Sequence, residues 1–354
     1  MLSPSRIYKA KNAEYNKYTL FIFILFMIGA ILCGGYGKRL KPLTDKVPKP
    51  LLEIKEDYTI LDKQLLQFKH AGVKKVVLLC GHLSDKIKDR FSDSWNGLEI
   101  EYSVEDKPRG TLYAINNLFK NYKSDAYIIR NGDIVCDVNI KEMMNGHKNK
   151  MLMYVTPLVS PYGIVEIQDS KIVGFREKPK LNHYINAGVY IMSKDLMPIL
   201  SKHEEGDIEK LAFPEISSSG LLNYYKEDVF WQSVDSIKDL DKVKDEYANK
   251  EDKPWGYEKV IVYTDKYLTK ELYLMKNEGT SHHMHPRKDE TMHVTSGEAV
   301  IKFDNRQVNL MKNGTIRIKP KTPHTIFALE NTLLQEYSTP HIDDTVRIKD
   351  IYGR

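Results

Sequence analysis

Between Ile28 and about Leu200, short apolar runs alternate with segments whose apolar residues recur every three or four positions. "IGAILC", "VKKVVLLC" and "AYIIRNGDIVC" are typical of buried strands, whereas "YTILDKQLLQFKHAG" and "GTLYAINNLFKNY" have helical spacing. Strands that are separated by helices favour a parallel sheet with helices on its faces. The alternation therefore predicts an α/β domain whose ligands bind at the carboxyl ends of the strands.

The texture of the sequence changes in "YANKEDKPWG", which is polar and charged and then breaks at Pro254 and Gly256. Many short β-rich runs follow, separated by turns such as "KNEG", "TSGE" and "MKNG". They predict an all-β barrel or jelly roll of about 100 residues. We expect three parts, namely an N-terminal extension over 1–26, an α/β domain over 27–248 and an all-β domain over 254–354.

The apolar run from Leu20 to Cys33 follows three lysines, the order of charge and apolarity that a signal peptide has. A membrane-spanning helix needs about 20 apolar residues, so the run is marginal for that role. We interpret "MIGAILC" as a buried first strand and Met27 as a natural start. Residues 1–26 are then an extension that is disordered or not translated, and a membrane anchor is the alternative.

The net charge of +5 is spread over 53 basic and 48 acidic residues, with no dense basic block interleaved with aromatic residues. This excludes nucleic acid as the favoured partner and suits an anionic small molecule bound in one positive cleft. Cys33, Cys80 and Cys136 all lie in strand-like stretches. Their odd number favours buried free thiols in a reducing compartment, which predicts a cytoplasmic protein.

A glycine-rich loop, "CGGYGKRLKPLTDKVPKPLLEI", begins directly after the first strand. Gly34, Gly35 and Gly37 let backbone N–H groups approach phosphate oxygens closely. Arg39 suits the oxygens of a triphosphate, and Lys49 provides a compact point charge whose direction two flanking prolines restrict. The phosphate loop of ATPases, G-x-x-x-x-G-K-[S/T], is absent. The loop suits phosphate binding, but glycines in a strand-to-helix turn more often form only a turn, and the complete run is far more specific than the glycines alone.

The complete run G-G-x-G-x-R-L-x-P-L-T-x-x-x-P-K-P-L closely resembles the signature of sugar-1-phosphate nucleotidyltransferases. "EDKPRGTLYAI", "NGD", "YGIVEI", "REKP" and "NAGVYIM" continue the resemblance in order. It implies a Rossmann-like sheet that is mixed and mainly parallel. It also implies Arg39 and Lys49 as catalytic residues, Gly34, Gly35, Gly37, Gly110 and Thr111 at the nucleotide, Asp133 on Mg²⁺, and Gly163, Glu177, Lys178 and Asn186 at the sugar phosphate.

The resemblance implies a reaction in which an oxygen of the sugar 1-phosphate attacks the α-phosphorus of the NTP while pyrophosphate leaves in line. This nucleophile is already anionic, so positioning and charge neutralisation carry the catalysis. We expect Arg39 to contact the leaving phosphates and Lys49 to stabilise the charge that develops between the substrates. Mg²⁺ on Asp133 would bridge phosphate oxygens.

One stretch departs from the family pattern, because many members carry W-x-D-x-G where this chain has "FWQSVDS". Ser233 stands at the position of the aspartate, and Asp235 lies two residues later. A shift of two along a strand keeps a side chain on the same face. The form W-Q-x-x-D resembles the cytidylyltransferase branch, so we expect Asp235 to be the second Mg²⁺ ligand.

The all-β segment contains a candidate metal site in "SHHMHPRKDETMH" and "PKTPH". His283 and His285 alternate on one face of a strand, Glu290 follows, and His324 lies on a later strand. Three imidazoles and one carboxylate suit a first-row divalent ion such as Zn²⁺, Mn²⁺ or Fe²⁺. The histidines of a metal-free barrel that bind a ligand or line its core are the alternative.

The spacing H-x-H-x(4)-E-x(6)-G, followed by G-x(5)-P-x(3)-H, resembles the two cupin motifs, and His282 and His293 fall outside it. With "KPWGYE" before it and "VRIKDIYGR" after it, the segment resembles the cupins related to type II phosphomannose isomerase. The isomerase itself reads closer to Q-x-H-x-x-R-x-E-H-W. The resemblance therefore implies a cupin jelly-roll barrel that is either an isomerase or epimerase of a sugar phosphate or a non-catalytic sugar-binding or dimerising domain.

Taken together, the motifs indicate an enzyme similar to mannose-1-phosphate guanylyltransferases, with an appended isomerase-like cupin, that uses GTP and mannose 1-phosphate. A glucose-1-phosphate cytidylyl- or thymidylyltransferase with a non-catalytic cupin is one alternative. A regulatory protein that binds sugar nucleotides without turnover is another. Cupins commonly associate through their sheets, so we expect a homo-oligomer.

Overall fold

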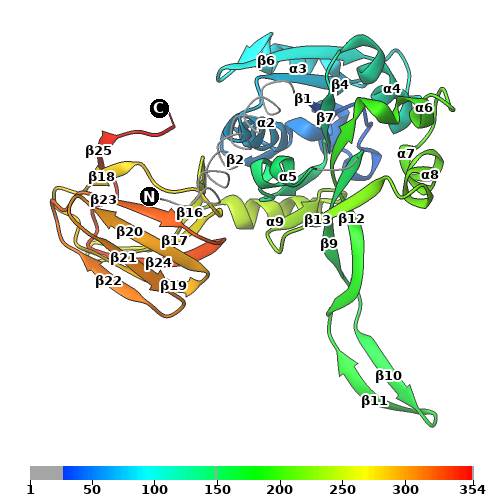
Figure 1. The fold of residues 1–354 in the computed structure, drawn as a ribbon. Helices are drawn as coiled ribbons and strands as arrows, with labels where there is room; N and C mark the ends of the chain where they lie inside the picture. The colour runs from blue at the N-terminus through cyan, green and yellow to red at the C-terminus, as the bar shows by residue number, and fades with distance from the viewer. Residues whose placement is uncertain (1–26, 148–149, 353–354) are drawn as a thin grey trace, which may run out of the picture. The chain divides into compact units, whose positions relative to one another are not determined.

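The computed structural model describes residues 27–147 and 150–352 of the chain. The chain divides into two compact units, Met1–Val243 and Lys244–Arg354 (Figure 1). The expected N-terminal extension lies outside the described residues. This division lies between Val243 and Lys244, and the domain limits expected at residues 248 and 254 remain predictions.

A mixed sheet with the strand order β13-β9-β12-β7-β1-β4-β6-β5 forms the centre of the first unit. Neighbours pair in parallel except at β12 and β5, which run antiparallel to their neighbours. The predicted mainly parallel sheet is thus confirmed. In chain order the strands are β1 (Ile28–Leu32), β4 (Lys75–Cys80), β5 (Ser94–Trp95), β6 (Leu98–Val104), β7 (Ala126–Asn131), β9 (Met151–Val159), β12 (Lys180–Ser193) and β13 (Leu222–Lys226).

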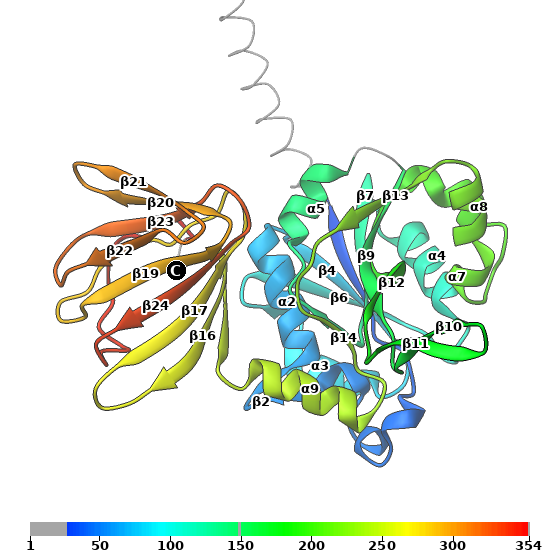
Figure 2. The same cartoon turned by 90° about the horizontal axis from the view of Figure 1, so that it is seen from below.

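Helices cover both faces of this sheet, because successive side chains of a strand point to opposite faces and both sets are apolar here. Figure 2 shows α2 and α3 on one side of the sheet and α4, α7 and α8 on the other. The helices are α2 (Ile60–Ala71), α3 (Ser84–Phe91), α4 (Thr111–Asn121), α5 (Ile140–Gly146), α6 (Met197–Leu200), α7 (Ile208–Leu211), α8 (Phe213–Ser218) and α9 (Ile237–Tyr247).

Three short 3₁₀ turns, rather than a long helix, follow the glycine loop: η1 (Lys38–Leu40), η2 (Leu43–Asp45) and η3 (Lys49–Leu51). The paired strands β2 (Glu53–Lys55) and β3 (Tyr58–Thr59) come next, and α2 begins only after them. Helix α2 begins where Thr59 and Asp62 form a reciprocal capping box, and it ends at Gly72 in the left-handed conformation.

Two further strand pairs extend the first unit. β8 (Ile134–Cys136) and β14 (Trp231–Ser233) pair antiparallel beside the central sheet. β10 (Ile164–Gln168) and β11 (Lys171–Arg176) form a hairpin that continues β9 and β12 away from the sheet (Figure 1).

The second unit consists of two antiparallel sheets with the orders β15-β16-β17-β24-β19-β22 and β21-β20-β23-β18-β25. Apolar side chains of both sheets form a common core, as the all-β prediction requires. The strands are β15 (Lys250–Lys253), β16 (Gly256–Tyr263), β17 (Leu268–Leu274), β18 (His282–Met284), β19 (Glu290–Ser296), β20 (Glu298–Phe303), β21 (Gln307–Met311), β22 (Thr315–Ile318), β23 (His324–Ala328), β24 (Thr332–Ser338) and β25 (Val346–Lys349).

Cys33, Cys80 and Cys136 are buried and form no disulfide. Burial raises the pKa of the Cys33 and Cys136 thiols, so both stay protonated near neutral pH. Within residues 27–147 and 150–352, no helix is both long enough and apolar enough to cross a membrane.

The capping box of α2 provides a test of the first unit's stability. Replacing Thr59 with alanine removes the hydroxyl that accepts the backbone N–H of Asp62 at 3.2 Å. We expect T59A to lower the free energy of unfolding by about 1 kcal/mol, the usual cost of losing a helix N-cap. Urea denaturation measures this change as a shift in the unfolding transition of the first unit. Thr345→Ala, at an exposed position, is the control and should leave that transition unchanged.

Candidate functional site

Four of the expected residues form one cluster: Arg39, Lys49, Asp133 and Asp235. Nζ of Lys49 lies 2.7 Å from Oδ2 of Asp133 and 3.1 Å from Oδ1 of Asp235. A guanidinium N–H of Arg39 donates to the same Oδ1 of Asp235 at 2.8 Å. The Lys49 side chain is 12% exposed and that of Arg39 is 77% exposed, so the lysine is held in place while the arginine reaches into solvent.

Local backbone structure brings the two carboxylates together. Asp133 lies in the turn between β7 and β8, and Asp235 follows β14. The pairing of β8 with β14 is extended by a hydrogen bond of 2.9 Å from the N–H of Val234 to the carbonyl of Asp133. Ser233, at the position where many family members have aspartate, donates to Oδ2 of Asp235 at 2.8 Å. The expected shift of two residues therefore does place Asp235 beside Asp133.

The charge of this cluster acts on Asp235. Burial raises the pKa of its carboxyl group, but the Ser233 hydroxyl, Lys49 and Arg39 together outweigh burial and hold the pKa below its ordinary value. Asp235 is thus ionised near neutral pH. Two carboxylates with free oxygen lone pairs are the kind of ligand that Mg²⁺ prefers, so Asp133 and Asp235 fit the expected metal.

A cavity of about 260 Å³ adjoins the cluster, and Lys49 and Asp133 belong to its lining. The rest of the lining comes from segments that follow β1, β6 and β7 and from the end of β4, which confirms a cavity at the carboxyl ends of the strands. The expected nucleotide residues in the lining are Gly34, Gly35, Gly110 and Thr111. Gly37 is not among the lining residues described, and its carbonyl accepts the hydroxyl of Thr44 at 2.9 Å.

The first turn of α4 faces this cavity. Gly110 precedes the helix with φ of +91°, and a Cβ there would lie 2.3 Å from the carbonyl oxygen of Gly206, so no larger residue fits. The Thr111 hydroxyl accepts the N–H of Ile208 at 2.9 Å and lies 3.2 Å from a carboxylate oxygen of Glu209. The N-terminus of α4 thus offers backbone N–H groups and a favourable dipole to a phosphate.

Glu105 is a cavity residue that the sequence analysis missed. It directly follows β6, and a Cβ on Gly34 would lie 3.0 Å from its Oε1. Its Oε2 is buried and has no hydrogen-bond partner among the described residues, and burial raises the pKa of this carboxyl group. An acid directly after a strand, inside the motif "EDKPRG", was the available signal.

The four residues expected at the sugar phosphate lie away from this cavity lining. Gly163 and Glu177 flank the β10–β11 hairpin and are neighbours, since a Cβ on Gly163 would lie 3.0 Å from Oε2 of Glu177. Glu177 and Lys178 form an exposed ion pair of 3.6 Å. Asn186, on β12, donates to the Tyr190 hydroxyl at 2.8 Å. Their role at a sugar remains a prediction.

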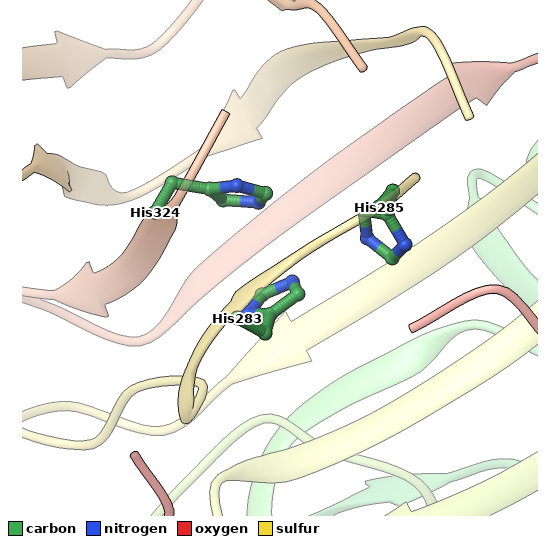
Figure 3. Close-up of side chains that lie close together, drawn as sticks. All are labelled: His283, His285 and His324. Atoms are coloured by element: carbon green, nitrogen blue, oxygen red, sulfur yellow. The ribbon is translucent and has the colours of Figure 1, made fainter. Parts of the chain in front are cut away.

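In the second unit, His283, His285 and His324 gather as expected. One ring nitrogen of each lies within 4.8 Å of the others (Figure 3). Register explains part of this cluster, because His283 on β18 pairs with His324 on β23. Glu290 at the start of β19 completes the set, with carboxylate oxygens 3.6 Å from Nε2 of His285 and 3.1 Å from Nε2 of His324.

The hydrogen bonds of the three rings fix which nitrogen can bind a metal. Nδ1 faces the carbonyl of Ser281 at 2.7 Å in His283, the carbonyl of Thr322 at 3.0 Å in His324, and Oδ1 of Asp344 at 3.1 Å in His285. Carbonyl and carboxylate oxygens only accept, so each Nδ1 carries its proton and each Nε2 has a free lone pair.

Burial acts on the ionisation of two rings of this cluster and on its hydrogen bonding. It lowers the pKa of His283 to about 3 and also lowers the pKa of His285, so both rings are neutral near pH 7. Nε2 of His324 and Oε1 of Glu290 are buried and face each other at 3.1 Å, two acceptors with no donor between them and no other hydrogen-bond partner among the described residues. Unsatisfied buried atoms are costly, and a divalent cation would satisfy them. The three histidines can therefore bind a metal.

His282 and His293, which fall outside the cupin spacing, also lie outside this cluster. His282 contacts Thr325 and Asp304, and His293 contacts Thr315. Asp344 was missed by the sequence analysis because no fixed spacing relates it to the histidines.

Two family models match the chain. The model described as "Nucleotidyl transferase" matches residues 28–250, and the model described as "Mannose-6-phosphate isomerase C-terminal" matches residues 241–338.

Curated relatives resemble the N-terminal part. The chain is 33% identical over 227 residues to "Mannose-1-phosphate guanylyltransferase catalytic subunit beta" of Xenopus tropicalis, which covers 60% of this chain and 62% of the relative. It is 33% identical over 192 residues to "D-glycero-alpha-D-manno-heptose 1-phosphate guanylyltransferase" of Campylobacter jejuni, which covers 52% of this chain and 84% of the relative. The chain thus spans less than two thirds of the Xenopus relative.

Solved structures share the fold. HddC from Yersinia pseudotuberculosis superposes with a TM-score of 0.51 at 23% sequence identity, covering 62% of this chain and 99% of HddC. A putative glucose-1-phosphate thymidylyltransferase from Bacillus anthracis superposes with the same TM-score at 22% identity, covering 62% of this chain and 94% of that one. These likenesses concern the fold of the N-terminal part.

The histidine cluster makes a direct prediction about metal content. We expect His324→Ala to weaken Zn²⁺ binding by at least about 100-fold, because a direct ligand should matter at least as much as its supporting residues. His293→Ala removes an imidazole outside the cluster and should bind Zn²⁺ as the wild type does. Atomic emission after dialysis against Zn²⁺ measures both. Equal Zn²⁺ content in the two variants would rule out the three-histidine site.

Proposed function

The chain belongs to the nucleotidyl transferase family, and we propose that it transfers a nucleotidyl group from an NTP to a sugar 1-phosphate with release of pyrophosphate. One observation carries the proposal. The Lys49 ammonium lies between the carboxylates of Asp133 and Asp235 at a cavity whose lining includes two glycines of the glycine loop, Gly34 and Gly35. A fixed cation beside a pair of metal-binding carboxylates suits a reaction between two phosphate anions.

Asp133 and Asp235 would hold Mg²⁺ through their carboxylate oxygens. When bound, Mg²⁺ neutralises phosphate charge and orients the phosphate oxygens. Lys49 contacts both carboxylates. Its charge would therefore lie next to any phosphate group that binds at this metal site. The two prolines on either side of Lys49 limit the positions that its backbone can adopt.

The sugar 1-phosphate needs no general base, because its attacking oxygen carries a negative charge. Positioning two anions against their mutual repulsion is then the main task of the site. Arg39 is well exposed and bonded to Asp235, so it can exchange that carboxylate for the oxygens of the leaving pyrophosphate. The N-terminus of α4 provides further N–H donors to the nucleotide phosphates.

We infer that the base is guanine. Both relatives described above are guanylyltransferases by name, and Glu105 supports the same base on chemical grounds. Guanine presents two neighbouring donors, N1–H and the N2 amino group, and a carboxylate accepts from both. Glu105 belongs to the cavity lining, and we propose that its carboxylate accepts this pair of donors there.

Mannose 1-phosphate is the sugar substrate that the name of the Xenopus relative favours, and the Campylobacter relative makes a manno-heptose 1-phosphate the second candidate. We assign four residues to the sugar phosphate: Gly163, Glu177, Lys178 and Asn186. Cytidylyl transfer to glucose 1-phosphate is the third candidate, supported by Asp235 in "WQSVDS".

The C-terminal unit, in our proposal, binds a divalent first-row metal and acts on a related sugar phosphate as an isomerase. The match of residues 241–338 to an isomerase domain and the free Nε2 atoms of the three histidines support this. We further propose that the protein is cytoplasmic, since three buried free thiols suit a reducing compartment. We also propose that it is a homo-oligomer, because cupins commonly associate through their sheets.

The role of Lys49 is testable by Lys49→Ala. Removing a fixed charge that stabilises the transition state should lower kcat about 10²- to 10³-fold. Pyrophosphate release with saturating GTP and mannose 1-phosphate measures it. Lys46→Ala, an exposed lysine of the same loop, is the matched control and should retain wild-type turnover. Wild-type activity in Lys49→Ala would mean that the proposed mechanism is wrong.

The assignment of guanine is testable by Glu105→Gln. Glutamine replaces one acceptor with a donor, so it cannot accept both guanine donors. We expect kcat/KM for GTP to fall about 10- to 100-fold, the range that one base contact provides, while turnover of CTP changes little or rises. Asp106→Asn, at the exposed neighbouring position, is the control. A uniform loss with every NTP would assign Glu105 to folding rather than to base choice.

A further inference from the structure

Residues near the C-terminus pair with β18, the strand that carries His283 and directly precedes His285. We call residues 339–352 the C-terminal strap. They lie beyond residues 241–338, which match the isomerase model. Strand β25 of the strap pairs with β18 in the register His282↔Lys349, His283↔Arg347 and Met284↔Val346. The strap is therefore part of the wall of the histidine cluster.

The strap is held by few buried contacts. All four residues of β25 are exposed, and β25 is the outermost strand of its sheet. Side-chain contacts at its two ends anchor it. Asp344 contacts His285 before the strand, and after the strand Asp350 accepts the Ser281 hydroxyl at 2.5 Å while the Tyr352 hydroxyl donates to the carbonyl of Gly279 at 2.7 Å. Segments with such sparse burial open at low free-energy cost.

Asp344 makes the contact that matters most for a metal. Its side chain is 5% exposed, and Oδ1 lies 3.1 Å from Nδ1 of His285. Oδ2 accepts the backbone N–H groups of Arg287 and Lys288 at 2.8 and 2.9 Å. These two bonds fix the carboxylate so that Oδ1 faces the ring. His285 is thus oriented by a side chain of the strap.

The other two histidines of the cluster are oriented differently. The Nδ1 atoms of His283 and His324 face backbone carbonyls two residues away, at Ser281 and Thr322, which belong to the same local segments. Of the three rings, His285 depends on a distant part of the chain. Release of the strap would leave its Nδ1 proton without this acceptor and its ring free to turn.

We propose that Asp344 is a positioning residue for the metal ligand His285, and that docking of the C-terminal strap and metal binding favour each other. The inference rests on the proposed metal site at His283, His285 and His324. A carboxylate that accepts Nδ1–H holds the ring and keeps the lone pair on Nε2. Linkage is reciprocal, so if a docked strap strengthens metal binding, a bound metal stabilises the docked strap by the same factor.

Asp344→Asn is the most specific variant, because asparagine has the shape of aspartate and changes only its charge and its hydrogen-bonding groups. Its amide oxygen can still accept the N–H groups of Arg287 and Lys288, while its NH₂ group faces His285. That group donates, so Nδ1 of His285 must accept and its proton moves to Nε2. The strap can then dock as before, but the ring presents no lone pair to the metal.

Two readouts on the full chain separate this role from a general structural one. We expect Asp344→Asn to bind Co²⁺ roughly 10- to 100-fold more weakly than wild type in competition with a chelating dye. In the metal-free protein, ¹⁵N NMR of the imidazoles should show His285 changing from the Nδ1–H to the Nε2–H tautomer. Asp343→Asn, at the exposed neighbouring position, is the matched control and should change neither readout.

Hydrogen exchange of the wild type tests the linkage without any substitution. Saturating Co²⁺ should slow amide exchange in residues 346–349 by roughly tenfold or more, because a bound metal stabilises the docked strap. A Co²⁺ affinity of Asp344→Asn within about twofold of wild type would overturn the inference, as would unchanged exchange in β25. A wild type that binds no Co²⁺ would overturn the proposed metal site itself, and with it this inference.

Discussion

The interaction on which the first unit's chemistry depends is the contact of one ammonium group with two carboxylates. Lys49 lies within hydrogen-bond distance of Asp133 and of Asp235, which are 84 and 186 residues away in the chain. Two local elements of the fold position these three side chains. The strand pair β8–β14 brings the two aspartates side by side, and Lys49 begins the 3₁₀ turn η3 (Lys49–Leu51), which directs the lysine towards them. The cavity beside this cluster then has a positive charge and carboxylate groups at its edge.

The histidine cluster of the second unit depends on how its rings are hydrogen-bonded. Each imidazole of the cluster is held by an oxygen that accepts Nδ1–H, so the lone pairs converge on one point. Burial disfavours protonation of His283 and His285, which would compete with a metal. In both units the strands bring together residues that are far apart in sequence, and hydrogen bonds around them decide which atoms remain available for a ligand.

Much of this arrangement was predictable because local patterns report it. Apolar residues that recur every three or four positions predicted the helices, and continuous apolar runs predicted the strands of the mainly parallel sheet. His283, His285, Glu290 and His324 follow a fixed spacing that strand geometry translates into one cluster. Asp235 was reached from Ser233, since two residues along a strand return to the same face. In each case the residues' own sequence spacing carries the geometry.

Other features had no such local signal. Glu105 and Asp344 owe their importance to burial and to an unusual hydrogen-bond environment, which depend on tertiary packing. The glycine loop leads into 3₁₀ turns rather than a helix because prolines at 42, 48 and 50 interrupt helical hydrogen bonding. The residues expected at the sugar phosphate lie on or beside the β9–β12 extension and its hairpin, whose course away from the sheet no periodicity encodes.

The most direct test of the account is pyrophosphate release by the purified full chain with Mg²⁺. ATP, GTP, CTP, UTP and dTTP would each be combined with the 1-phosphates of mannose, glucose, galactose, N-acetylglucosamine and a manno-heptose. The account predicts that GTP with mannose 1-phosphate gives the highest kcat/KM. Release of pyrophosphate chiefly from CTP with glucose 1-phosphate would contradict the assignment of base and sugar. No release from any combination would contradict nucleotidyl transfer to these sugars.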